Sequence, residues 1–584
     1  MPVILRGIMA KTRLLTFIIF LFLCLTLVSV RSYGQTTMIS APHLLTDPFL
    51  QLPTTNSVQV VWFTEFPGKK HVVSYGENLD KSSLAITTKL SRTREDQQSK
   101  VANQTINQPV QRDIWRHEAE VTGLTAGVRL PYRVMSVRED GASVSSDVFT
   151  LAPTPEPGQA LKILLTSDHQ LKPMTAANLQ KVVETVGQVD GVWFAGDLIN
   201  VSDRASEWFD DSRGGALFPA LQGHAHYEMT HDGVKTTYTG GEIIQHAPMF
   251  TAIGNHEVMG RLGRTDSLNN EFNDPIPRDV AQRLSSGKSL IDNSFNTYTY
   301  EEIFSLPQSQ TGGKKYYAVS FGDVRLVVLY ITNTWRTPNL NTAYKGRYQE
   351  APQDLENPEN WGYGQLIFEP IAKGSQQYNW LETELKSAEF QQAKYKVVMF
   401  HHPPHTLGDN IVPAYTNPVQ IIERDQNGKI TAVRYEYPKE ADYINRDVVP
   451  LLEAAEVQFV LYGHSHLWNR FVSPSGMHFL ETSNVGNSYG AAWGDKKREI
   501  PNGYKEDYVA LGDPYGLEPV TPTIAPLLGE NNQPLPYIAS NDITVFSIFD
   551  TGKGIVTSYY FDTSKPDSDV VKFDEFKLQR FSGK

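Results

Sequence analysis

The chain has 584 residues, with 53 Lys and Arg against 65 Asp and Glu, and a formal net charge of −12. This length exceeds what one hydrophobic core usually fills, so we expect two or more domains. A chain with this negative charge has no general positive electrostatic field. We therefore do not expect it to bind nucleic acid or anionic membrane surfaces. A small phosphorylated substrate is compatible with this charge, because a metal ion can supply local positive charge. The oligomeric state stays open.

The N-terminus predicts an export signal. Basic residues precede an uncharged apolar run over 14–30, and small residues follow that run. We therefore expect 1–34 to be a signal peptide and the protein to be exported, either periplasmic or secreted. A retained membrane anchor is the alternative, since the run is close to the shortest membrane span.

The only cysteine, Cys24, lies inside the apolar run. A mature chain without it has no disulfide, no thiolate metal ligand and no cysteine nucleophile. An exported protein without cysteine is more typical of a bacterial periplasm than of animal secretion.

Two patterns divide the remaining chain. Residues 36–155 hold short segments rich in Val, Tyr and Phe between turn residues, such as "SVQVVWFT" and "LPYRVMSVRED", and this spacing predicts a small β-sandwich. The proline-rich "APTPEPG" then reads as a linker. We place a second domain over 158–584.

In the second domain, continuous apolar segments alternate with helical ones, as in "ALKILL", "TAANLQKVVETV" and "DGVWFAGD". Such strands belong to a sheet that is covered on both faces. We also expect a hairpin over 314–332, an amphipathic helix over 378–390 and two strands over 544–562. Long insertions between these elements are expected to shape a substrate pocket. They lie near 258–312, 335–375, 405–440 and 487–540.

The ends of the expected strands carry residues that can bind metal ions. They read "SDHQ", "AGDLIN", "IGNHE", "MFHHPP" and "YGHSH" in chain order. Ligand sites in such folds lie beyond the carboxyl ends of the strands. Carboxylates, an amide and imidazoles form a mixed ligand set that suits a pair of ions from Mn, Fe and Zn. One fragment alone would more often be a turn, but the whole series at strand ends indicates a metal centre.

This order resembles the calcineurin-like metallophosphoesterase superfamily, whose signature is Asp-x-His, Gly-Asp, Gly-Asn-His-Glu/Asp, His and Gly-His-x-His. The sandwich with "DPFLQLPTTNSVQVVWFT" resembles the fibronectin-type domain in front of purple acid phosphatases. The resemblance implies an α/β fold, a four-layer α-β-β-α sandwich preceded by a small all-β fibronectin-III-like domain. It narrows the family to the purple-acid-phosphatase-like branch.

The resemblance also implies two metal ions, of Fe, Mn or Zn, bridged by Asp197. The first ion would also be bound by Asp168 and His466, with Gln170 at the remaining ligand position. The second ion would also be bound by Asn255, His401 and His464. His401 is preferred to His402 because the family pattern is His-x-Pro. A hydroxide between the ions would attack phosphorus in line.

Further residues are assigned to catalysis and substrate by the same resemblance. His256, oriented by Glu257, would stabilise or protonate the leaving oxygen. Asn255 and Arg470 would contact the phosphate, with a structural ion pair as the alternative for Arg470.

Two positions depart from the family pattern. Gln170 stands where the signature has histidine, so we expect the first metal position to be the weaker and more exchangeable one, with a preference for harder ions. His169 should point away from Asp168, because the chain there is nearly extended. Asn200 replaces the tyrosine of purple acid phosphatases, which argues against the purple chromophore and a locked ferric ion.

Two motifs are expected to be decoys. "GHAH" at 223–226 precedes "GNHE" and breaks the family order, so we place it in an insertion near the mouth of the site. "GNSYG" at 486–490 matches the nucleophile elbow of serine hydrolases, but no histidine follows His478, so Ser488 lacks its triad partner. We expect a glycine-rich loop near the pocket instead.

Together these residues predict an exported metal-dependent phosphoesterase, in the first place an acid-phosphatase-like phosphomonoesterase. A phosphodiesterase on the same site is one alternative. A degenerate metal-binding or adhesion module without turnover is another, which the intact bridging and acid-base positions disfavour.

Overall fold

The computed structural model describes residues 41–284, 289–335, 346–410, 415–498 and 510–579. The chain divides into two compact units, Met1–Pro42 and His43–Lys584, and the description below concerns the second. The predicted signal peptide and Cys24 lie outside the described residues. In the described part of the chain, no helix is both long and apolar enough to cross a membrane.

The first strands form two antiparallel sheets with a shared core. One has the order β1-β2-β8-β5, and the other has the order β10-β9-β3-β4 with β11 beside β9. Trp62 and Val121 from the first sheet pack against Val73 and Tyr132 from the second. The strands are β1 (Phe49–Gln51), β2 (Ser57–Thr64), β3 (Lys70–Tyr75), β4 (Lys81–Leu84), β5 (Ile86–Lys89), β8 (Trp115–Thr122), β9 (Leu130–Val137), β10 (Ser143–Ser145) and β11 (Phe149–Leu151).

A short ribbon of β6 (Arg94–Glu95) and β7 (Val110–Gln111) joins this β-rich part to the chain that follows. Arg94 forms ion pairs with Asp203 at 2.7 Å and with Glu271 at 2.6 Å. The side chains of both acids are nearly inaccessible, at 1% and 2% exposure. The ribbon is therefore fixed by buried charge pairs.

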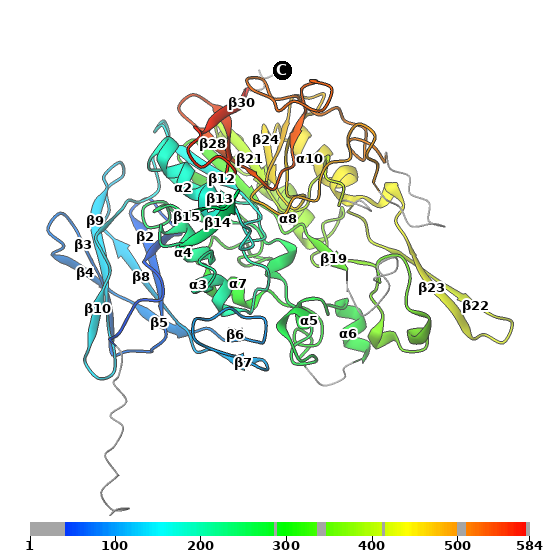
Figure 1. Cartoon of the computed structure of the whole chain (residues 1–584), viewed down its shortest axis with the longest axis horizontal. Coiled ribbons are helices and arrows are strands. Elements are labelled where there is room, and N and C mark those ends of the chain that lie inside the picture. Colours follow the sequence, from blue (N-terminus) through cyan, green and yellow to red (C-terminus); the bar gives the residue numbers. More distant parts are fainter. Residues whose placement is uncertain (1–40, 285–288, 336–345, 411–414, 499–509, 580–584) are drawn as a thin grey trace, which may run out of the picture. The chain divides into compact units, whose positions relative to one another are not determined.

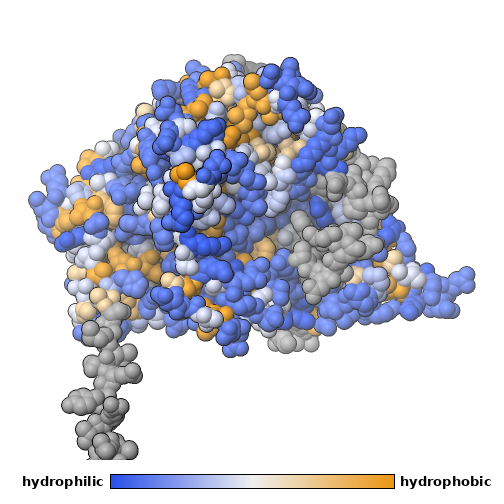
Figure 2. Space-filling view, viewed as in Figure 1, coloured by the Kyte–Doolittle hydropathy of each residue, from blue (hydrophilic) through white to orange (hydrophobic). Residues whose placement is uncertain are grey.

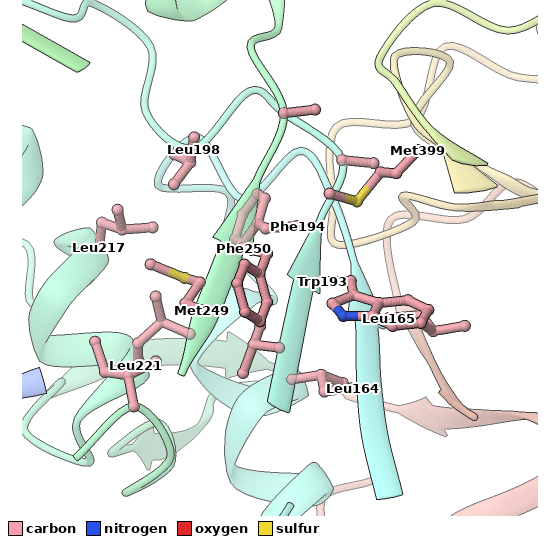
Figure 3. Close-up of a cluster of buried hydrophobic side chains, with 14 of the residues drawn as sticks. Leu164, Leu165, Trp193, Phe194, Leu198, Leu217, Leu221, Met249, Phe250 and Met399 are labelled. Atoms are coloured by element: carbon pink, nitrogen blue, oxygen red, sulfur yellow. The ribbon is translucent and has the colours of Figure 1, made fainter. Parts of the chain in front are cut away.

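A six-stranded sheet begins the second half of the fold, in the order β16-β13-β12-β28-β29-β30. The pairs β12·β13 and β13·β16 are parallel, so the carboxyl ends of these strands lie at one edge. Figure 3 shows their continuous apolar character, with Leu164 and Leu165, Trp193 and Phe194, and Met249 and Phe250 on neighbouring strands. The strands are β12 (Lys162–Thr166), β13 (Gly191–Phe194), β16 (Met249–Thr251), β28 (Ile543–Asp550), β29 (Ile555–Asp562) and β30 (Val571–Lys577).

A seven-stranded sheet faces it, in the order β17-β18-β21-β24-β26-β25-β27. Its strands β18, β21, β24 and β26 are parallel neighbours. Met399 and Leu461 from this sheet join Leu165 and Phe549 from the first in one core. The strands are β17 (Tyr317–Phe321), β18 (Val324–Val328), β21 (Tyr395–Met399), β24 (Phe459–Tyr462), β25 (Trp468–Val472), β26 (His478–Thr482) and β27 (Tyr537–Ile538).

Helices cover the outer face of each sheet. On the six-stranded sheet lies α2 (Thr175–Val186; Figure 1). Asn178 Nδ2 of this helix donates to Val545 O of β28 at 2.8 Å. On the seven-stranded sheet lie α8 (Gln376–Leu385), α9 (Ala388–Gln392) and α10 (Val449–Ala454), which share a second core with it. The predicted four-layer α-β-β-α fold is thereby confirmed.

The segments that connect these strands and helices contain further short elements. They are α3 (Ala205–Phe209), α4 (Leu217–Leu221), β14 (Tyr227–His231), β15 (Val234–Tyr238), α5 (Leu268–Phe272), α6 (Arg278–Leu284), α7 (Tyr298–Ile303), β19 (Asn333–Trp335), β20 (Gln365–Ile367), β22 (Val419–Arg424) and β23 (Ile430–Glu436). Single turns lie at η1 (Asn255–Glu257), η2 (Pro352–Asp354), η3 (Pro358–Asn360), η4 (Lys439–Ala441) and η5 (Ile444–Val448). On the face drawn in Figure 2, hydrophobic residues occur in small groups among hydrophilic ones.

Candidate metal centre

The predicted ligands come together where parallel strands of both sheets end. Asp168 follows β12, Asp197 follows β13 and Asn255 follows β16, while His401 follows β21 and His464 follows β24. Asp168, Asp197 and His401 are at most 1% exposed. The site thus lies at the carboxyl edges of the facing sheets, as expected for this class of fold.

The backbone at these positions is in a conformation that side chains rarely adopt. Asp168 and Asp197 both have φ of 58°, and His464 and His466 have φ of 83° and 55°. Each such residue costs about 1 to 3 kcal/mol, and such residues cluster at functional sites. The strain is concentrated here because each loop turns sharply after its strand and directs its side chain into the site.

Asp197 is the centre of the arrangement. Its Oδ2 lies 3.1 Å from His401 Nε2 and accepts a hydrogen bond from Gln170 Nε2 at 2.7 Å. Its Oδ1 accepts from the backbone N–H of His256 at 2.9 Å. Gly254 permits this close approach, because a Cβ there would lie 2.1 Å from Asp197 Oδ1.

The imidazoles are oriented by backbone carbonyls. His401 Nδ1 donates to Ala195 O at 2.8 Å, and His466 Nδ1 donates to Asn487 O at 3.0 Å. Each bond fixes the tautomer and leaves Nε2 free, which is how metal-binding histidines are usually held. His464 instead turns Nδ1 inward, 3.1 Å from Asn255 Oδ1 and 3.2 Å from His401 Nε2.

Charge in the site favours carboxylate at Asp197. Burial alone would raise its pKa, but the neighbouring His401 and His256 hold it well below its usual range. The pKa of His401 is raised to about 10, because Asp197 outweighs the burial that would lower it, so a metal ion bound at Nε2 would displace a proton. Burial and the nearby His401 lower the pKa of His464 to about 3, so His464 is neutral and can act as a ligand.

Two buried oxygens in the site have no hydrogen-bond partner among the described residues, Asp168 Oδ1 and Gln170 Oε1. An unpaired buried polar atom costs about 1 to 3 kcal/mol. His466 Nε2 lies 3.4 Å from the same Asp168 oxygen. A cation bound here would satisfy both oxygens, so the residues fit a metal ion.

The donor atoms also form close groups. In one group the candidate ligand atoms of Asp168, Asp197 and His401 lie within 4.8 Å of one another. In the second group the same holds for His401, His402 and His464. His401 belongs to both groups, and its Nε2 lies 3.1 Å from Asp197 Oδ2.

Comparison with known proteins gives the family. Residues 161–467, more than half of the chain, match the model of the calcineurin-like phosphoesterase family. The chain belongs to this family. It is therefore a metal-dependent phosphoester hydrolase.

A solved structure supports the fold at low sequence identity. Purple acid phosphatase PPD1 from yellow lupin (Lupinus luteus) seeds is 14% identical with a TM-score of 0.50, over 90% of this chain and 73% of that chain. GAP50, the anchor in the inner membrane complex of Plasmodium, is 11% identical with a TM-score of 0.30, over 72% of this chain and 90% of that chain. No curated protein matches the chain.

Gln170 of this phosphoesterase reaches the site despite replacing histidine. Its amide nitrogen binds the central Asp197, and its backbone O accepts from Asn200 Nδ2 at 2.7 Å. Asn200 thus holds Gln170 in place. His169 turns away, as predicted, to bond Thr166 Oγ1 at 2.8 Å and to pack edge-on against Phe194. The reason given for it is wrong, because the chain is not extended here: Asp168 and Gln170 have φ of 58° and 42°.

The prediction that Glu257 orients His256 is wrong. His256 Nδ1 donates to Asn200 O at 2.6 Å, while Glu257 accepts backbone N–H groups of Asp197, Leu198 and Gly254 at 2.9, 2.8 and 2.6 Å. Glu257 therefore joins the loop that carries Asp197 to the loop that carries Gly254 through backbone hydrogen bonds. Burial, together with the charge of Asp197, raises its pKa to about 8. The Nε2 atom of His256 faces Asp197 Oδ2 at 3.9 Å.

The assignment of Arg470 to the substrate is also wrong. The guanidinium is 3% exposed and binds both oxygens of Asp574 on β30, at 2.8 and 3.2 Å. This is the structural ion pair given above as the alternative. It joins the last strand of one sheet to β25 of the other.

The two decoy motifs have structural roles. His224 Nε2 bonds Asp47 Oδ2 at 2.7 Å, and His226 donates its backbone N–H to Gly214 O. The loop at 486–490 adjoins the site, as predicted, because Asn487 O holds His466. His402 stacks on His464 at 3.8 Å, and neither of its ring nitrogens has a hydrogen-bond partner in the described residues.

Sequence reasoning missed Glu481, a fully buried carboxylate on β26. It accepts Ser465 N at 2.7 Å, Thr406 Oγ1 at 3.0 Å and Asn469 Nδ2 at 3.1 Å. Ser465 lies between the candidate ligands His464 and His466, so Glu481 supports their loop as Glu257 supports the other. The only sequence signal is a charge inside an apolar strand.

Proposed function

We propose that the protein is an exported phosphoesterase with two metal ions, acting on phosphate monoesters in the manner of an acid phosphatase. The observation that carries the proposal is the position of Asp197. Its carboxylate contacts Gln170 and His401. The other proposed ligands divide into two donor groups by their contacts, Asp168 with His466, and Asn255 with His401 and His464. One carboxylate between two donor groups is the pattern of a bridged pair of ions.

When bound, the metal ions would neutralise phosphoryl oxygens and lower the pKa of a water nucleophile. Asp168, Gln170, Asp197 and His466 would hold one ion, and Asp197, Asn255, His401 and His464 the other. The Nδ1–H of His256 is bound to Asn200 O and burial lowers the pKa of the ring, so Nε2 is unprotonated at rest and would take up a proton before passing it to the leaving oxygen.

Metal content and turnover test this proposal together. We expect two equivalents of metal per chain by mass spectrometry and faster hydrolysis of p-nitrophenyl phosphate than of bis(p-nitrophenyl) phosphate. Asp197→Ala should remove both metal and activity. Full activity in that variant would contradict the bridged pair, a preference for the bis-ester would indicate a phosphodiesterase, and a metal-loaded protein inert on both would favour a binding module.

Export is proposed from the charged and apolar pattern of residues 1–34 alone. Expression of the full chain in a bacterium, followed by N-terminal sequencing of the periplasmic fraction, tests it. We expect a mature N-terminus near residue 35. Recovery of the uncleaved chain from the cytosol would argue against export.

A further inference from the structure

Tyr489 is unusual because its ring is exposed. Among the large apolar side chains that are exposed in the described residues, it is the only aromatic one, at 50% exposure. Aromatic rings carry much apolar area and are normally covered. An exposed aromatic ring is therefore informative where a scattered exposed aliphatic side chain is not.

The ring lies directly against the metal centre. It stacks on His466 with ring centroids 5.0 Å apart and an interplanar angle of 30°. His466 Nε2 in turn lies 3.4 Å from Asp168 Oδ1. One part of the ring is therefore covered by a candidate ligand, while the rest is open to solvent beside the place where a phosphoryl group would bind.

The loop that carries Tyr489 is tied down on both sides of it. Before the tyrosine, Asn487 O accepts from His466 Nδ1 at 3.0 Å, and Ser488 N donates to Asn541 Oδ1 at 2.7 Å. Gly486 and Gly490 flank this segment with φ of 108° and 107°, a conformation that glycine adopts freely.

A lysine fixes the loop after the tyrosine. Lys496 Nζ donates to Tyr489 O at 3.4 Å and pairs with Asp409 at 2.6 Å. A Cβ at Gly490 would lie 2.3 Å from the same Nζ, so the glycine makes room for this contact. The ring is thus held ready before any ligand arrives, and its contact with a ligand costs little ordering entropy.

We propose that Tyr489 is a specificity-determining residue that stacks on a planar aromatic group of the substrate, so that esters with an aryl or nucleobase group bind better than alkyl esters. The proposal rests on the proposed phosphoesterase function and names its substrate class. Stacking of a planar group on an aromatic side chain strengthens binding. We expect a preference of about tenfold, which corresponds to about 1.4 kcal/mol.

Binding without turnover gives the decisive test. Phenylphosphonate and methylphosphonate are stable analogues that differ in the planar ring. Calorimetric titration of the metal-loaded full chain should show that Tyr489→Ala weakens phenylphosphonate about tenfold and leaves methylphosphonate unchanged, while Tyr489→Phe keeps the wild-type affinities. Ile86→Ala, which removes another exposed apolar side chain at 74% exposure on β5, should change neither.

Equal weakening of both phosphonates by Tyr489→Ala, or no weakening of either, overturns the proposal. Wild-type protein that binds phenylphosphonate in this way but hydrolyses no phosphate ester would refute the proposed function and still support the role of Tyr489. Kinetics then separate the two sources of a planar group. A loss of kcat/KM in Tyr489→Ala on phenyl phosphate alone assigns an aryl ester, and a loss on adenosine 5′-phosphate alone assigns a nucleotide, with glycerol 3-phosphate as the unaffected reference.

Discussion

Gln170 replaces an expected imidazole with an amide that both donates and accepts. Its Nε2 donates to Asp197, and its Oε1 has no hydrogen-bond partner among the described residues. The amide thus takes up part of the negative charge that the central carboxylate would otherwise offer to a cation. A neutral carbonyl oxygen is also a poorer ligand than imidazole for borderline ions.

We therefore expect Gln170→His to strengthen metal binding at the first position about tenfold or more for Zn²⁺ and less for Mn²⁺. Competition with a chromophoric chelator measures both affinities. Gln170→Asn, which keeps the amide but shortens its reach, is the matched control and should weaken binding. Unchanged Zn²⁺ affinity in the histidine variant would show that Gln170 is only a neighbour of the site.

Glu257 acts on the ligands through the backbone. It accepts N–H groups from both the Asp197 loop and the Gly254 loop. Glu257→Gln places an NH₂ donor against one of these N–H groups, and we expect metal affinity to fall about 10- to 100-fold. Calorimetric metal titration checks this. Glu481→Gln should act in the same way on the His464 loop, whereas Glu228→Gln on the exposed β14–β15 hairpin should leave affinity unchanged.

At the scale of elements, the hydrophobic pattern was enough to predict the central strands and helices. It did not predict where one helix is interrupted or that a further strand lies at the edge of a sheet. The helix over 175–186 and the hairpin over 314–332 are present as predicted. The helix predicted over 378–390 is divided into α8 and α9, because Ser387 caps the second helix by accepting from Phe390 N. Strand β30 was missed, since "VKFDEFK" alternates only in part and carries charges.

The candidate metal centre was predictable because its residues lie in short segments directly after strands. A turn at a strand end is local, so the fragments with Asp168, Asp197 and His464 were visible in the sequence. Partners supplied from distant segments were not visible, which is why Arg470 was misassigned while its partner Asp574 lies 104 residues away. The carbonyl of Asn200 that holds His256 was missed for the same reason.

The N-terminal sheets contain a buried pair of stacked imidazoles. His71 and His117 lie with ring centroids 3.6 Å apart, and His117 bonds Thr64 Oγ1 at 2.8 Å and Thr87 Oγ1 at 2.9 Å. Burial first, and then the neighbouring His71, lowers the pKa of His117 to about 2, and burial lowers that of His71 too. Both rings are therefore neutral in the folded chain.

This pair should make the fold sensitive to acid. Below the histidine pKa of about 6.5 in the unfolded chain, the unfolded chain binds protons that the folded chain does not bind. The free energy of unfolding therefore decreases as the pH falls from about 6.5 towards 2. Each such histidine contributes up to about 1.4 kcal/mol per pH unit. Thermal unfolding between pH 8 and pH 4 should show a smaller decrease for His117→Gln than for wild type. Parallel curves would mean that His117 takes up its proton in the folded state.

At the scale of the whole described molecule, buried charges connect the N-terminal sheets to His256 at the candidate metal centre. Asp96 accepts from Arg204, Arg204 pairs with Glu207 at 2.7 Å, and Glu207 accepts Asn200 N at 2.7 Å. The carbonyl of Asn200 then holds His256. We therefore expect the β-rich part to support the candidate metal centre and to unfold together with it.

Arg94→Met tests this at the β6–β7 ribbon. The change leaves Asp203 and Glu271 buried without their shared cation, which typically costs about 3 to 5 kcal/mol. We expect calorimetry to show one unfolding transition in wild type and a lower transition temperature for the whole chain in the variant. Lys235→Met, which removes an exposed pair with Glu228, should leave the transition unchanged. Two separate transitions, only one of them shifted, would show that the ribbon does not couple the two parts, because loss of a shared buried cation should weaken both partners at once.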